Sequence, residues 1–276
     1  MKVKIIKSTL LLKEKEQEAR IAKQKAGFFA RKRAEIWNIV GEKVIEKLGK
    51  EENDDKNIKN ITNRKQTGQA VSKILKKLKR EIKIGSSGKE LDKLARQIME
   101  EEKVKSSSLG YNGFPAAICV SLNQELTHGI PDERIFKNGD LVSIDVACNY
   151  QGYHADAALT AIVGEGDEKK QNLLKITKDS LYYVIQKIKP NITTTQDIGE
   201  MLEKYLKVRQ GYYSYYPIKE YGGHGIGENL HQTPFVPNYK TVDRVEVIKE
   251  GMFICIEPLV QLGDGQITEL MIPPSN

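Results

Sequence analysis

The hydrophobic and polar positions after residue 60 predict two helices. From residue 71 onward, apolar side chains recur at intervals of three and four residues, which places them on one face of a helix. These side chains are Val71, Ile74, Leu75, Leu78 and Ile82. Ser87 and Glu90 then have the spacing of a capping box, so a second helix is expected to begin there. Its buried face is expected to carry Leu91, Leu94 and Ile98.

Three apolar runs after these helices have the composition of strands. They span residues 116–123, 140–150 and 154–164. The second and third runs are separated by a short segment around Gly152, which predicts a tight turn between two paired strands.

A second series of elements repeats this order further along the chain. Residues 168–188 are predicted to form a helix that ends before Pro190, and another helix is predicted to begin near Thr195. The apolar run 253–262 predicts a strand, although no partner strand for it is found in the sequence. Helices followed by strands, twice over, indicate an α+β domain built from two similar halves. The halves share negligible sequence identity, so the duplication is a hypothesis about architecture.

The composition is typical of a globular protein, with 276 residues, 39% hydrophobic and 29% charged. The apolar run near the N-terminus is far too short to span a bilayer, and no small-residue cleavage site follows it. Cys119, Cys148 and Cys255 are odd in number and irregularly spaced, which argues against a disulfide framework. We therefore expect a cytoplasmic protein whose three cysteines are small buried hydrophobic residues.

Positive charge is concentrated at the N-terminus. Residues 1–33 contain eleven Lys or Arg against three Asp or Glu, while the whole chain carries +7. We expect residues 1–57 to form a basic, charged helical extension and residues 58–276 to form the main domain. A cationic arm is attracted to phosphate-rich surfaces such as ribosomal RNA. The alternative is a solvated charged helix or a partly disordered tail.

Three carboxylates lie inside apolar, strand-like runs: Asp145, Asp156 and Glu257. A buried carboxylate is costly unless it is paired, protonated or bound to a cation. In the predicted strand pair, Asp145 and Asp156 come close to facing one another, and a divalent metal would reverse their repulsion. A local salt bridge is the common explanation for one such acid, but three acids together with a glycine-flanked His224 favour a metal site.

The chemistry of these ligands limits the metal. Carboxylates with one imidazole suit Mn, Fe or Co, with Zn possible, and argue against a structural zinc site. So many carboxylates would overcharge one ion, so we expect two ions that share a bridging carboxylate. Two ions about 3.5–4 Å apart can hold a hydroxide and polarise a carbonyl, which indicates a hydrolase.

The stretch GGHGIGENLH, residues 222–231, places His224 and His231 among closely spaced glycines. Glycine lets the backbone approach a neighbour closely because it has no Cβ. A phosphate-binding loop is disfavoured, since no Lys–Ser/Thr pair follows and no strand–turn–helix pattern surrounds the glycines. The stretch is therefore interpreted as the wall of a metal site.

Four stretches, in this order, closely resemble the type I, bacterial methionine aminopeptidases: SLGYNGFPAAICVSLNQELTHGIP, NGDLVSIDVACNYQGYHADAALT, YGGHGIGENLHQTP and GMFICIEPLV. The resemblance covers residues 58–276 and implies the pita-bread fold, in which two pseudo-symmetric α+β halves surround a dinuclear metal site. Only 26 positions separate His231 from Glu257, which leaves no room for the helical insertion of the type II enzymes.

The resemblance also implies residue roles. Asp145, Asp156, His224 and Glu257 would be the metal ligands, with Asp156 bridging two divalent ions and Glu257 also accepting a proton from the nucleophile. The substrate would be contacted by His128 near its scissile amide, by His231 at the carbonyl oxygen as it becomes an oxyanion, and by a methionine pocket of Tyr111, Phe114 and Leu230. Sulfur–aromatic contact in that pocket would favour an unbranched thioether.

The sequence departs from the family pattern at three places. Leu230 stands where the family usually has Phe, and Ser108 where Cys is common. The family's fifth ligand, a second bridging Glu on the final strand, has no match before Asn276, because the context of Glu269 differs from that motif. We therefore expect a domain that lacks its last strand, through a premature C-terminus, with impaired metal binding and stability.

The activity implied by the resemblance is removal of the initiator methionine from new chains whose second residue is small. The expected partners are nascent polypeptide N-termini and, through the extension, the ribosome; we expect a monomer with no membrane association. Two alternatives stay open: a degenerate, inactive pita-bread binding module, or a related metallopeptidase of the Xaa-Pro type.

Overall fold

The computed structural model describes residues 55–209, 213–243 and 245–263. Almost all of the predicted extension, residues 1–57, lies outside the described residues, and so does Glu269. The chain divides into two units between Ile58 and Lys59. Apart from the first residues of helix α2, every element described below belongs to the second unit.

Helices α2 (Asp55–Glu81) and α3 (Gly88–Glu101) open the first half of the domain. The predicted capping box is present: the Ser87 hydroxyl accepts the Glu90 N–H, and the Glu90 carboxylate accepts the Ser87 N–H. The apolar stripe predicted for the first helix is buried, and it packs with α3 and the sheet into one core. The first two helix predictions are confirmed.

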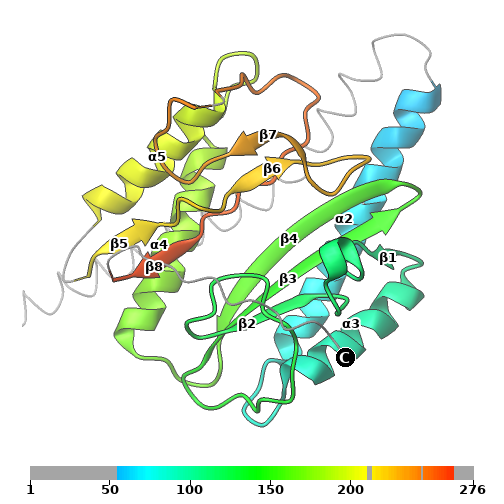
Figure 1. The fold of residues 1–276 in the computed structure, drawn as a ribbon, viewed down its shortest axis with the longest axis vertical. Coiled ribbons are helices and arrows are strands. Elements are labelled where there is room, and N and C mark those ends of the chain that lie inside the picture. The colour runs from blue at the N-terminus through cyan, green and yellow to red at the C-terminus, as the bar shows by residue number, and fades with distance from the viewer. Residues whose placement is uncertain (1–54, 210–212, 244, 264–276) are drawn as a thin grey trace, which may run out of the picture. The chain divides into compact units, whose positions relative to one another are not determined.

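An antiparallel sheet packs on these helices (Figure 1). Its central strand β3 (Leu141–Tyr150) pairs along its whole length with β4 (Tyr153–Ile162), and on its other side with β2 (Cys119–Leu122) and β1 (Lys105–Ser106). Gln151 and Gly152 join β3 to β4 with φ of 53° and 88°. Two successive positive φ values are those of a type I′ turn, whose twist matches that of paired strands. The predicted hairpin is confirmed.

The second half begins again with two helices, α4 (Glu168–Ile185) and α5 (Thr195–Val208). Helix α4 ends three residues before the predicted end at 188. Antiparallel strand pairs follow, β5 with β8 and β6 with β7, which Figure 1 shows beside α4 and α5. The bounds of these strands are Tyr215–Pro217 for β5, Gly223–Gly225 for β6, Gln232–Val236 for β7 and Val260–Leu262 for β8.

The prediction of one continuous strand over residues 253–262 is wrong. Only β8 at its end is a strand, and Ile254 forms an isolated bridge with Gly225. The reason is a change of partner along the segment: the Cys255 N–H donates to the His224 carbonyl on β6, whereas the Leu259 carbonyl accepts the Ile218 N–H just after β5. The contact with β6 is limited to an isolated bridge, the ladder with β5 begins only at Val260, and Pro258 between them has no N–H to donate.

Each half has its own hydrophobic core. The first contains Ile74, Leu78 and Ile98 from the helices with Ile144 from the sheet, and the second contains Val184, Ile198 and Leu202 with residues Val236 and Ile248. Two helices packed on strands, twice over, confirm the predicted α+β architecture of two halves. A site that lies between the two halves can therefore draw its side chains from both.

Candidate metal centre

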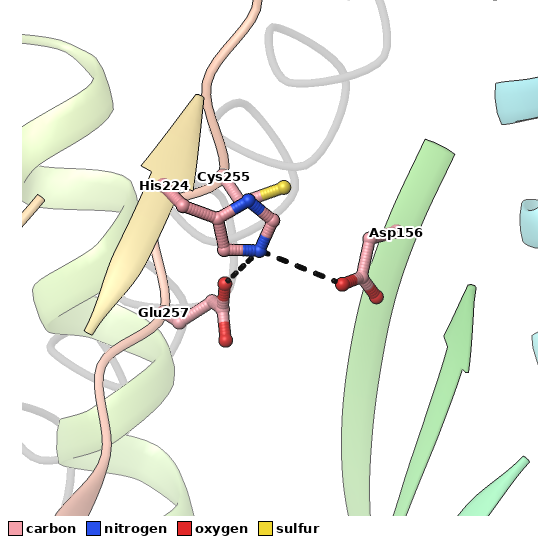
Figure 2. Close-up of side chains that lie close together, drawn as sticks. All are labelled: Asp156, His224, Cys255 and Glu257. Atoms are coloured by element: carbon pink, nitrogen blue, oxygen red, sulfur yellow. Dashed lines mark ion pairs between the residues drawn. The ribbon is translucent and has the colours of Figure 1, made fainter. Parts of the chain in front are cut away.

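Three segments carry the predicted metal-binding side chains to one place. Asp156 lies on β4 in the first half, His224 lies on β6 in the second half, and Glu257 lies in the extended segment before β8. Figure 2 shows the Asp156 and Glu257 carboxylates each joined by a dashed line to the same nitrogen of the His224 ring, Nε2. One donor atom of each residue, and of Cys255, lies within 4.8 Å of the others.

The His224 ring is oriented so that one nitrogen faces the acids. Its Nε2 lies 3.2 Å from Glu257 Oε1 and 3.8 Å from Asp156 Oδ2. Its Nδ1 lies 2.9 Å from the Gly225 carbonyl oxygen, which can only accept a hydrogen bond. Nδ1 therefore carries the proton, and in the neutral imidazole the Nε2 lone pair points at the acids, as a metal ligand requires.

Asp145 lies beside this group on β3. The strand register pairs Asp145 with Ala158 and Ala147 with Asp156, so the two acids are diagonal neighbours on one face of the sheet. Burial raises the pKa of Asp145 well above its usual value, and the charges of Asp156 and Glu257 raise it further. The predicted proximity of Asp145 and Asp156 is present, with an offset of two residue pairs along the ladder.

The electrostatics of the group call for a cation. Burial lowers the pKa of His224, but its interactions with Asp156 and Glu257 outweigh this effect and bring the pKa to about 10. In addition, Glu257 Oε1 is buried, and its ion pair with His224 Nε2 at 3.2 Å does not have the geometry of a hydrogen bond. A carboxylate oxygen left in this way is costly unless a cation or proton meets it. The donor set of carboxylates and one imidazole fits a divalent metal.

The glycines of the 222–231 stretch allow the close approach that the sequence predicts. A Cβ on Gly223 would lie 2.1 Å from the Cys255 carbonyl oxygen, and a Cβ on Gly225 would lie 2.1 Å from the Thr233 carbonyl oxygen. No side chain fits at either distance. Residues 223 and 225 must therefore be glycine for β6 to lie between the 253–259 segment and β7. The result is that His224 is held against the segment that carries Glu257.

His231 lies next to His224, and Tyr111 holds it. The two imidazole rings are 4.4 Å apart between centroids in an edge-on arrangement, and His231 Nδ1 lies 2.8 Å from the Tyr111 hydroxyl. Burial lowers the pKa of His231, and the charge of His224 lowers it further. His231 is therefore neutral near pH 7 and lies at the edge of the donor group.

The other predicted substrate residues are arranged around this centre in different ways. His128 is exposed, with a positive φ of 56°, and its ring meets the Tyr221 ring edge-on at 5.6 Å. Phe114 is half-buried at the end of the turn that begins at Tyr111. Leu230 is buried in a small cluster with Ala147 and Ile226, where it packs as an interior residue.

Cys255 was missed as a member of the group. The sequence predicts a buried hydrophobic residue, which describes Cys119 and Cys148, but the Cys255 thiol is only partly buried and lies among the donors. Burial raises its pKa, and the neighbouring Asp156 and Glu257 raise it further, so the thiol is protonated in the metal-free protein. A signal was present in the sequence, because residues two apart in an extended segment point to the same face.

Buried acids and an imidazole gathered between two α+β halves define a metal-dependent hydrolase. The sequence model of metallopeptidase family M24 matches residues 62–272, and the chain belongs to this family. Methionine aminopeptidase 1 of Bacillus subtilis is 37% identical over 206 residues, which cover 75% of this chain and 81% of that protein. Methionine aminopeptidase of Mycoplasma capricolum is 38% identical, with coverage of 75% and 81%.

Solved structures agree with this assignment. The crystal structure of methionine aminopeptidase from Thermotoga maritima has a TM-score of 0.72 at 36% identity, covering 76% of this chain and 83% of that one. Prolidase from Pyrococcus furiosus, at 23% identity and a TM-score of 0.60, shares the fold; the match covers 72% of this chain and 56% of that one. The predicted pita-bread fold and the resemblance to the methionine aminopeptidases are both confirmed.

No helix among the described residues is both long enough and apolar enough to cross a membrane.

Proposed function

We propose that this protein is an aminopeptidase that removes the N-terminal methionine from new polypeptides whose second residue is small. The observation that carries the proposal is the convergence of Asp156, His224 and Glu257 from three segments onto one place. The names of the relatives, methionine aminopeptidases at 37% and 38% identity, supply the substrate class. The same likeness favours an active enzyme over an inactive binding module.

The metal ligands in this proposal are Asp145, Asp156, His224 and Glu257, with Asp156 shared by two divalent ions of Co, Mn, Fe or Zn. The burial of Asp145 and of the Glu257 Oε1 atom, which no hydrogen bond meets among the described residues, supports the assignment. Bound there, the ions would polarise the scissile carbonyl and lower the pKa of a water molecule. Glu257 would hold a metal and accept the proton that this water gives up.

His231 is assigned to the oxyanion that develops on the scissile carbonyl. The Tyr111 hydroxyl lies 2.8 Å from Nδ1. If this hydroxyl donates, the neutral ring carries its proton on Nε2, and the Nε2–H is free to donate to the substrate oxygen. The lowered pKa of His231 supports this role, because a neutral ring of fixed tautomer is a directed donor.

The remaining contacts bind and orient the substrate. His128 is assigned to the substrate near its scissile amide, where its exposed ring is held edge-on by Tyr221. Tyr111 and Phe114 are assigned to the methionine pocket, in which aromatic rings favour a thioether. Leu230 is assigned to the same pocket, at a position where its side chain packs against Ile226.

Release of methionine from the tripeptide Met-Ala-Ser by the metal-loaded protein tests this function. We expect hydrolysis that depends on added Mn²⁺ or Co²⁺ and no cleavage of an Xaa-Pro peptide, because the methionine pocket selects the first side chain. Cleavage of the Xaa-Pro peptide alone would instead support the Xaa-Pro type of metallopeptidase. Absence of both activities in a protein shown to bind metal would favour the binding module.

The finer assignments concern the two ends of the chain. Residues 58–276 are proposed to form the catalytic domain of a cytoplasmic monomer. Residues 1–57 are proposed to bind ribosomal RNA, because this segment concentrates the positive charge of the chain. Nascent polypeptide N-termini would then reach the enzyme at the ribosome.

A further inference from the structure

We propose that Arg64 is a positioning residue of the metal centre. This side chain of helix α2 contacts all three segments that carry the clustered donors, although it touches none of the donors itself. The inference rests on the proposed function, because it assumes that the cluster binds metal.

The first contact is with the glycine-rich stretch. Arg64 Nη1 lies 3.4 Å from the Ile226 carbonyl oxygen, so the guanidinium donates to the backbone two residues after His224. The two terminal nitrogens also lie 3.0 and 3.2 Å from the place that a Cβ on Gly227 would occupy. Arg64 therefore fills the space that glycine leaves at residue 227.

The other two contacts are with aromatic rings. The guanidinium carbon lies 4.9 Å from the centroid of the Tyr153 ring and 4.5 Å from that of the Phe253 ring. Tyr153 begins β4, three residues before Asp156, and Phe253 comes four residues before Glu257. Each ring thus belongs to a segment that carries one of the acids. Cation–π attraction favours a guanidinium at this distance from a ring face.

Further bonds tie the same segments to α2 and to each other. The Thr67 hydroxyl, one turn along the helix, donates to the Asn63 carbonyl at 2.8 Å and lies 3.3 Å from the Tyr153 carbonyl, and the His154 N–H donates to the Gly227 carbonyl at 2.8 Å. Arg64 lies where these links meet, since its guanidinium also contacts the Phe253 ring, and the Ile226 N–H donates to the Phe253 carbonyl at 3.1 Å. A planar guanidinium can meet ring faces and donate in its own plane, which the single ammonium of a lysine cannot reproduce.

The test is a titration of Co²⁺ into the metal-free full-length protein, for wild type, Arg64→Met and Arg64→Lys. The dissociation constant and the visible absorption of bound Co²⁺ report the geometry of the centre without any need for turnover. We expect Arg64→Met to weaken binding by about 10- to 100-fold, the range seen when outer partners of a metal site are lost, and to change the absorption spectrum. Arg64→Lys should fall between Arg64→Met and wild type.

Lys76→Met is the matched control, because Lys76 is an exposed cation on the same helix. It should leave both the dissociation constant and the spectrum unchanged. Urea denaturation of each variant shows whether it is folded under the conditions of the titration. If Arg64→Met is unfolded, Arg64→Lys decides the question.

Wild-type affinity and spectrum in a folded Arg64→Met, or in Arg64→Lys where Arg64→Met is unfolded, would overturn the inference. Failure of the wild-type protein to bind Co²⁺ has a different meaning. It would remove the metal centre, and with it both the proposed function and the role of Arg64. The two failures are therefore distinguishable in one experiment.

Discussion

His224 is the residue on which the centre depends most directly. Burial alone would keep its ring neutral, but Asp156 and Glu257 at 3.8 and 3.2 Å favour the charged form, so that its pKa is about 10 in the absence of metal. A proton therefore takes the place that a metal would take. Because Nδ1 is hydrogen-bonded to the Gly225 carbonyl, Nε2 is the ring nitrogen that binds either the proton or the metal.

Replacing this ring is the sharpest test of the ligand assignment. We expect His224→Ala to abolish the release of methionine from Met-Ala-Ser that added Mn²⁺ or Co²⁺ stimulates, because His224 supplies the imidazole that lies against both acids. The measurement is the initial rate over a range of metal concentrations, alongside the number of Mn²⁺ ions bound. Full activity in His224→Ala under added metal would rule out the assignment.

The sequence was a good guide to residues whose burial is costly. Asp145, Asp156 and Glu257 could be found because a carboxylate in an apolar strand needs a partner. Cys255 and Arg64 could not be found in this way: a cysteine in an apolar run costs nothing, and an arginine on a charged helix is ordinary. What gives these two their places is the tertiary packing, which brings residues 64 and 253 within reach of one another.

At the scale of elements, close packing of β6 brings the imidazole to the acids. The capping box of α3 and the hairpin of β3 and β4 could be predicted because local spacing and turn chemistry determine them. The 253–262 segment could not, since its structure depends on two partners that lie elsewhere in the chain. Its apolar pattern predicts burial, but the change of hydrogen-bonding partner from β6 to the residue after β5 depends on the tertiary structure.

Substitution of Gly223 tests the importance of this close approach. We expect Gly223→Ala to destabilise the protein by about 1–3 kcal/mol, because the new methyl group would lie 2.1 Å from the Cys255 carbonyl oxygen and force the segment away from β6. Metal affinity should fall as well, because the same segment carries Glu257. Urea denaturation and Co²⁺ titration measure the two effects.

Gly68→Ala is the control for this substitution. Gly68 lies within helix α2, where an added Cβ has no neighbour within 4 Å among the described residues. Alanine there should raise the free energy of unfolding by about 1 kcal/mol, because glycine is a poor helix former. Wild-type stability and metal affinity in Gly223→Ala would show that the close approach of β6 to Cys255 is not required.

At the scale of the whole molecule, each half has its own hydrophobic core, and the metal-binding side chains come from both halves. Each half buries its own apolar side chains, whereas Asp156 on β4 of the first half meets His224 on β6 and Glu257 before β8 of the second. Both cores and the repeat of helices and strands could be predicted from periodicity, because burial on one face of a helix or strand leaves a pattern in the sequence. The distances between Asp156, His224 and Glu257 could not, since these depend on how the two halves pack.

Positive charge gathered in residues 1–33 leads to the last prediction. We expect the full-length protein to sediment with ribosomes and its affinity to fall steeply as salt rises from about 50 to 200 mM, because contacts with phosphate release bound counterions. A variant that lacks residues 1–54, and so keeps helix α2 whole, should bind much more weakly.

Both forms should release methionine from Met-Ala-Ser at the same rate, since the donors all lie in the second unit. This control separates loss of the arm from damage to the domain. If the two forms bound ribosomes equally and without regard to salt, the attraction would not be electrostatic and would not reside in the extension. The arm would then be a solvated charged segment, and the enzyme would have to meet its nascent substrates through another surface.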